Sequence, residues 1–169
     1  MGYSWRRADA PLPGHRRNTR KHPAASGYIR QFSHSHGRCY RKVKDALAAH
    51  APGQRGLIPR WYSGVAARTG RDALQSYGFV NLLETEPYKS QIKKPSQAPK
   101  GAVLVYSSGV PCRGTRIPDC GHIEIKTGRP GNNAFVSDYS YPTGINETPA
   151  ALRFGSRYKL IGVMIKPTN

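Results

Sequence analysis

The sequence predicts an α+β fold, with helices in the first half of the chain and an antiparallel sheet in the second. Two observations lead to this class. Apolar residues recur at helical spacing from Cys39 to about His50, and again from about Gly64 to Tyr77. After residue 100 they fall instead into short runs that alternate with Gly, Pro and Asn, which is typical of strands joined by turns.

The first helix is expected to bury one face and to end where Pro and Gly follow it. The residues of that face are Val43, Ala46, Leu47 and Ala49. Pro52 and Gly53 then close the helix, and Gly78 closes the second one. Residues 79–83 form an apolar run that predicts a short strand, and residues 87–100 are rich in Pro and Lys and predict a surface connection.

Four further segments are expected to form the antiparallel sheet on which the helices pack. They are residues 102–106, 122–126, 134–139 and 160–165. The first is continuously apolar, as expected of a buried strand, while the second alternates and has one face toward the core. The turn at 128–133 joins the second segment to the third and makes them neighbours.

Length and charge together predict one folded domain with a basic arm. The chain has 169 residues, with 27 Lys and Arg against 9 Asp and Glu, so its formal net charge is +18. Residues 1–26 contain little apolar surface, so we expect a flexible arm there and a domain at 27–169. The charge indicates an anionic partner, such as nucleic acid, acidic lipid or the bacterial envelope. No window is apolar enough to span a membrane.

A cysteine and a histidine far apart in the sequence are the candidates for chemistry. Cys39 stands at the start of the first helix, where the positive end of the macrodipole stabilises a thiolate. His122 begins the alternating strand and is well placed to take and return a proton. Asp138, on the adjacent strand, is expected to orient the imidazole as the third member of a triad. Glu124 shares the strand face of His122 and is a substitute orienter, although a solvent-facing glutamate is the plainer interpretation.

Three motifs resemble the CHAP and NlpC class of papain-like peptidoglycan hydrolases, which includes amidase effectors of type VI secretion. They are Gly37-Arg38-Cys39, the run from Gly121 to Ile125, and the run from Phe135 to Tyr139. The resemblance covers about residues 28–166 and implies a papain-like fold. It also implies that Cys39 is the nucleophile, His122 the base and Asp138 the orienting residue, with Glu124 and Ser137 in support. Arg38 stands where these enzymes tend to carry a glutamine, which leaves the second donor of the oxyanion hole open.

The other two cysteines, Cys112 and Cys120, bracket a loop just before His122. They are expected to form a disulfide, which leaves Cys39 as the odd, free thiol and indicates an oxidising compartment. Two alternatives are a pair of reduced loop cysteines and a zinc site, for which the spacing is unsuitable. His34 and His36 resemble a metal-binding tract, but a polar loop beside the cleft is the preferred interpretation.

These observations predict a cysteine amidase or endopeptidase that cuts peptidoglycan stem peptides, with no metal or cofactor. No secretory signal is recognisable at the N-terminus, so we expect export without a cleavable signal and action in the periplasm or wall of a target bacterium. An antibacterial toxin of this kind requires an immunity protein, which we expect to be acidic. The alternatives are a phage-type endolysin with the same chemistry, a thiol hydrolase of another acyl substrate, and a basic nucleic-acid-binding module. The last is disfavoured because no nucleic-acid motif is found.

Overall fold

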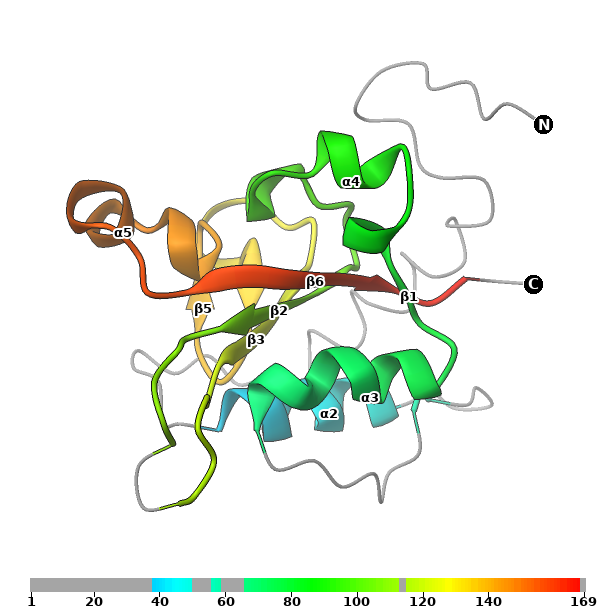
Figure 1. Cartoon of the computed structure of the whole chain (residues 1–169). Coiled ribbons are helices and arrows are strands. Elements are labelled where there is room, and N and C mark those ends of the chain that lie inside the picture. Colours follow the sequence, from blue (N-terminus) through cyan, green and yellow to red (C-terminus); the bar gives the residue numbers. More distant parts are fainter. Residues whose placement is uncertain (1–37, 50–55, 59–65, 113–114, 168–169) are drawn as a thin grey trace.

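A six-stranded antiparallel sheet forms the centre of the molecule, with the strand order β1-β6-β2-β3-β4-β5. The structure is a computed structural model that describes residues 38–49, 56–58, 66–112 and 115–167 (Figure 1). The strands are β1 (Val80–Asn81), β2 (Val103–Ser107), β3 (His122–Lys126), β4 (Phe135–Val136), β5 (Ser140–Tyr141) and β6 (Lys159–Ile165). The helices are α2 (Cys39–Ala48), α3 (Gly70–Ser76), α4 (Tyr88–Gln91) and α5 (Pro149–Phe154). The predicted α+β class is confirmed.

Helices α2 and α3 cover one face of the sheet (Figure 1). The buried residues of this layer include Val43, Ala46, Leu47, Leu74, Val103, Val105, Ile123, Ile125 and Met164. Val43 and Leu47 are almost completely buried, and each such side chain contributes about 1.5–3 kcal/mol when it leaves water. This packing fixes α2, and therefore its first residue, against the sheet.

The opposite face of the sheet is covered by α4 and by the segments around it (Figure 1). Its buried cluster includes Leu82, Ile92, Ala98, Leu104, Tyr106, Phe135, Val163 and Ile165. Strand alternation explains the division, because neighbours in β2 such as Val103 and Leu104 point to opposite faces. With apolar residues on both faces, β2 is buried throughout its middle, as the continuous run predicted.

Helix α2 begins at Cys39, as predicted, and ends slightly earlier than expected. Ala48 is buried, whereas Ala49 is only partly so. The second helix, α3, is shorter than expected because a 3₁₀ turn at Ala67–Thr69 precedes it. The expected starting residues 64 and 65 and the expected stop at 52 and 53 lie outside the described residues.

The strand expected at 79–83 is shorter, because the side chain of Asn81 redirects the backbone. Its Oδ1 accepts hydrogen bonds from the N–H groups of Leu83 (3.2 Å) and Val163 (3.0 Å), and a 3₁₀ turn begins at Leu82. The connection expected at 87–100 also contains structure, namely α4 and a 3₁₀ turn at Pro95–Gln97.

Strands β2, β3 and β4 follow one another as predicted, but the strand expected at 134–139 is only Phe135–Val136, and a bend and the unexpected strand β5 follow it. The last strand does not extend this meander. Strand β6 lies between β1 and β2. Its residues Val163 and Met164 are completely buried, which explains why this apolar strand occupies an interior position. In the part of the chain that is described, no helix has the length and apolar content needed to cross a bilayer. The basic arm at 1–26 and the residues His34 and His36 lie outside the described residues.

Candidate active site

Cys39 is the first residue of α2 and carries a partly buried, free thiol. The start of the helix is tied to the sheet, because the backbone N–H of Arg38 donates to Oδ2 of Asp138 at 3.0 Å. The positive end of the helix dipole also stabilises a carboxylate at this position. The N–H groups of the first turn have no acceptor within the helix, so the N–H of Cys39 is available as a donor beside its own thiol.

His122 opens β3 and its side chain is only 4% exposed. The sharp entry into the strand depends on Gly121, whose φ is +65°. A Cβ at Gly121 would lie 2.3 Å from the carbonyl oxygen of Tyr106 and 2.8 Å from the amide nitrogen of Arg68. Its N–H donates to Oγ of Ser108 at 3.1 Å. A glycine is therefore required directly before the histidine.

The thiol of Cys39 and the imidazole of His122 line the same cleft, and the proximity of Cys39 is one of the causes that raise the pKa of His122. Burial alone lowers the pKa of His122, but the interactions with Cys39 and with the carboxylate of Glu124 outweigh burial and raise it to about 10. With the carboxylate of Glu124 beside it, the imidazole is thus protonated at neutral pH. This pair has the arrangement of a thiolate–imidazolium nucleophile.

Glu124 is the carboxylate nearest to the imidazole among the contacts of His122. Its Oε2 lies 3.5 Å from Nε2 of His122, an ion-pair contact longer than an ordinary hydrogen bond. Its Oε1 accepts hydrogen bonds from the hydroxyl of Tyr106 (2.5 Å) and the N–H of Ile145 (3.3 Å). Burial and the charge of Glu124 raise the pKa of Tyr106, so that hydroxyl stays protonated as a donor. Glu124 itself is 2% exposed.

Three tyrosine rings surround the imidazole of His122. The ring centroids of Tyr106, Tyr139 and Tyr158 lie 5.9, 5.7 and 5.8 Å from it. The ring of Tyr139 is nearly parallel to the imidazole, whereas that of Tyr158 presents its edge. Such rings exclude water and attract a cation, which strengthens the interaction between His122 and its charged neighbours.

Asp138 is almost completely buried, and its Oδ2 accepts a hydrogen bond from the start of α2. Besides the contact with Arg38, its Oδ1 accepts from Oγ of Ser137 at 3.3 Å. The end of β4 explains this direction. Strand β4 ends at Val136, which pairs with Ile125, and Asp138 lies in the bend at 137–139 that follows. Glu124, by contrast, points to the same face of β3 as His122.

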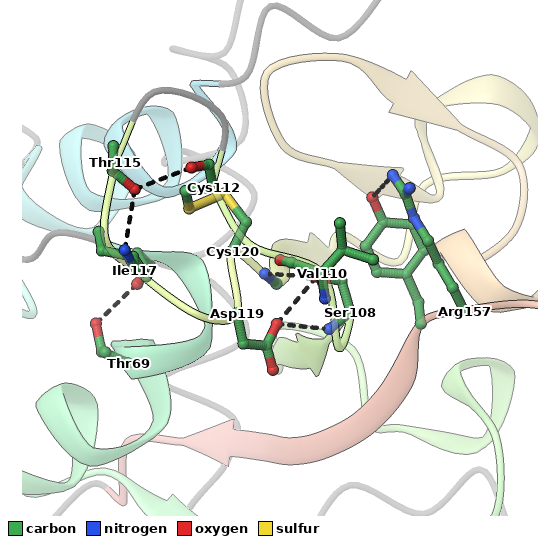
Figure 2. The surroundings of a disulfide bond; sticks show 12 residues. Thr69, Ser108, Val110, Cys112, Thr115, Ile117, Asp119, Cys120 and Arg157 are labelled. Atoms are coloured by element: carbon green, nitrogen blue, oxygen red, sulfur yellow. Dashed lines mark hydrogen bonds between the residues drawn. A yellow bond between two sulfur atoms is a disulfide. The ribbon is translucent and has the colours of Figure 1, made fainter.

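The expected disulfide between Cys112 and Cys120 is present, with the two Cα atoms 4.6 Å apart. Figure 2 shows the loop it closes and the hydrogen bonds of Asp119 beside it. Asp119 accepts from the N–H and Oγ of Ser108, both at 2.9 Å, and from Oγ of Ser107 at 2.5 Å. Burial opposes the charge of Asp119, but these bonds prevail and lower its pKa. The disulfide and this carboxylate together fix the segment that leads into His122.

A cleft of about 740 Å³ opens on Cys39 and His122. One wall is the first half of α2, and the other comprises the disulfide segment and residues 157–158. Within the described ranges, no group of His, Cys, Asp and Glu side chains is arranged to hold a metal ion. The site therefore brings together a thiol, an imidazole, two buried carboxylates and a cleft, a set suited to nucleophilic attack on a carbonyl group.

Comparison of the chain with protein-family models, curated proteins and solved structures finds no match. Sequence reasoning missed Tyr106, Tyr139 and Tyr158. A signal existed for Tyr106, because a tyrosine at the end of a continuously buried strand needs a partner for its hydroxyl. No pattern linked Tyr139 or Tyr158 to His122.

Proposed function

We propose that this protein is a papain-like cysteine amidase or endopeptidase that hydrolyses peptidoglycan stem peptides. The observation that carries the proposal is the pairing, in one cleft, of the free thiol of Cys39 at a helix N-terminus with the buried imidazole of His122. Both side chains line the same cleft, so a substrate carbonyl has access to the thiol. A buried structural cysteine would require neither the cleft nor the charged histidine.

The reaction proceeds by acyl transfer in two halves. The Cys39 thiolate attacks the amide carbonyl, and the carbonyl oxygen takes up the negative charge. The backbone N–H of Cys39 stabilises that oxyanion. When the C–N bond breaks, His122 gives its proton to the leaving amine. Neutral His122 then takes a proton from water, whose oxygen attacks the thioester, and the thiolate departs as the acid product forms.

Two carboxylates have separate positioning roles in this proposal. Glu124 orients the imidazole and stabilises its charged form, since its Oε2 lies 3.5 Å from Nε2. The hydroxyl of Tyr106 fixes that carboxylate from the other side. Asp138 positions the first turn of α2, and hence the thiol and its N–H, through Arg38. Ser137 supports Asp138.

The choice of peptidoglycan rests on the three motifs shared with CHAP and NlpC enzymes and on the net charge of +18. A cationic enzyme concentrates on an anionic wall polymer. We further propose an antibacterial toxin that acts in the periplasm or wall of its target and is neutralised by an acidic immunity protein. A disulfide in the site loop is compatible with an oxidising compartment.

Incubation of purified wall sacculi with the protein, followed by mass spectrometry of released fragments, tests the proposal. Wild-type protein should release stem-peptide fragments, and Cys39→Ala and His122→Ala should each lose at least about 1,000-fold in rate, because such residues act as a unit. Ser76→Ala, exposed at the end of α3 and outside the cleft lining, is the matched control. Circular dichroism confirms that each variant is folded.

Two outcomes would contradict different parts of the proposal. Release of fragments at the wild-type rate by the Cys39→Ala protein would remove the thiol mechanism. Cys39-dependent cleavage of other acyl compounds, with no action on sacculi, would leave the mechanism and overturn the substrate.

A further inference from the structure

The walls of the cleft carry a marked excess of positive charge close to the thiol. Four basic residues line it, namely Arg38, Arg41, Lys44 and Arg157, against the single acidic residue Asp45. Arg38 directly precedes α2, and Arg41 and Lys44 lie on it; the three follow one another at intervals of three residues, along one side of the start of the helix. Arg157 comes from the segment before β6, on the other wall.

Arg157 is held in place beside the catalytic histidine. Its Nη2 donates to the hydroxyl of Tyr158 at 3.1 Å, and its guanidinium carbon lies 5.1 Å from the centre of that ring. The ring of Tyr158 in turn contacts the imidazole of His122. Only one side chain therefore separates the guanidinium from the imidazole.

Arg38, Arg41 and Arg157 form no ion pair with a carboxylate in the described part of the chain. Other surface arginines do find such partners. Arg68 faces Asp119, and Arg71 faces Asp72. These three guanidinium groups are thus available to an anion that enters the cleft. A guanidinium presents parallel N–H donors that match the two oxygens of a carboxylate.

We propose that this basic rim, with Arg157 and Arg41 as its main donors, is a subsite for a free carboxylate on the substrate beside the scissile amide. The inference rests on the proposed amide hydrolysis and adds a specificity to it. The enzyme prefers a peptide whose neighbouring acid group is free over the same peptide with that group as a carboxamide. The carboxamide keeps the size and shape but lacks the charge.

Binding to the Cys39→Ala protein tests the subsite without turnover. Isothermal titration with the two forms of one synthetic stem peptide, carboxylate and carboxamide, should show at least about tenfold tighter binding of the carboxylate. That preference should shrink as salt is raised, because the contacts are partly exposed to solvent. Equal affinity for the two forms at low salt would overturn the proposal.

Kinetics with the active enzyme test which residues cause the preference for the carboxylate peptide. Arg157→Gln and Arg41→Gln should each raise KM for the carboxylate peptide about tenfold, with kcat changed less than twofold. KM for the carboxamide peptide should stay within twofold. Arg153→Gln is the matched control, since Arg153 is exposed on α5 and lies outside the cleft lining.

The outcomes separate this inference from the proposed function. If the wild-type enzyme cuts both forms with the same kcat/KM, the subsite is wrong and the hydrolase stands. If neither form is cut but the Cys39→Ala protein still binds the carboxylate form preferentially, the proposed hydrolysis is wrong and the anion site stands. Equal losses in Arg157→Gln and Arg153→Gln would show a general effect of surface charge and overturn the subsite.

Discussion

Glu124 lies two residues after His122 on β3, and its Oε2 is 3.5 Å from Nε2 of the imidazole. Tyr106 lies directly across from His122 on β2 and donates its hydroxyl to the other oxygen of the same carboxylate. Three side chains from two paired strands therefore form a buried chain that ends at the histidine. Asp138 instead bonds to the backbone ahead of Cys39.

Replacement of each carboxylate by its amide should affect activity to a different extent. Glu124→Gln removes the charge that faces the imidazolium, so kcat should fall roughly 100- to 10,000-fold, as for an orienting carboxylate. Asp138→Asn keeps an oxygen acceptor for the N–H of Arg38, so activity should fall much less. Steady-state kinetics on a soluble stem peptide measures both.

Tyr106→Phe is the control that keeps the ring and removes only the hydroxyl. It should lower kcat less than Glu124→Gln, while destabilising the fold by about 1.5–3 kcal/mol, since a hydrogen bond to a buried charge is lost. A larger loss of kcat in Asp138→Asn than in Glu124→Gln would reverse the two assignments.

The pH profile should report the raised pKa of His122. The imidazolium donates a proton to the leaving amine, so kcat/KM should hold above neutrality and decline as pH rises through about 10. Glu124→Gln removes a negative neighbour, which lowers the pKa of His122 and should shift the alkaline limb to lower pH. An alkaline limb that stays in place or moves upward in this variant contradicts the contact.

Iodoacetamide should label one thiol in the native, non-reduced protein. Cys39 should react because it carries a free thiol in an open cleft beside the imidazole of His122. Cys112 and Cys120 should react only after reduction, since they form a disulfide. His122→Ala should slow labelling at pH 6, which mass spectrometry of tryptic peptides measures. Rapid labelling of all three cysteines without a reductant is the opposite result.

Deletion of residues 1–26 should separate capture from chemistry. Each basic charge near an anionic surface contributes on the order of 1 kcal/mol, and salt screens that contribution. The truncated protein should therefore bind intact sacculi more weakly and with less salt dependence, while turnover of a small soluble stem peptide stays within twofold. Loss of turnover on the small peptide would show that this segment is needed for the folded site.

A DNA-binding measurement tests the nucleic-acid alternative. The full-length Cys39→Ala protein should show only weak, sequence-independent binding to duplex DNA. Tight, salt-sensitive DNA binding, combined with no action on sacculi, would favour a nucleic-acid-binding module.

The sequence by itself determined the fold class and two parts of the site. The helical spacing of Val43, Ala46 and Leu47 was enough to predict a helix that begins at Cys39, because one buried face sets both the length of the helix and its orientation against the core. The Gly-His pair at 121–122 and the alternation after it were enough to begin β3, because period-two burial and a left-handed glycine are local properties.

The partners of His122 were decided only by the tertiary structure. A strand pattern tells which residues share a face, but register and strand order depend on pairings between residues far apart in the chain. The insertion of β6 between β1 and β2, the approach of Tyr106 to Glu124 and the return of Asp138 to the start of α2 are all of this kind. Asp138 was matched to His122 because the two strands were correctly expected to be neighbours. Strand β4 ends before Asp138, which lies in a bend and accepts from the backbone of Arg38, while Glu124, on the same strand as His122, has the local contact.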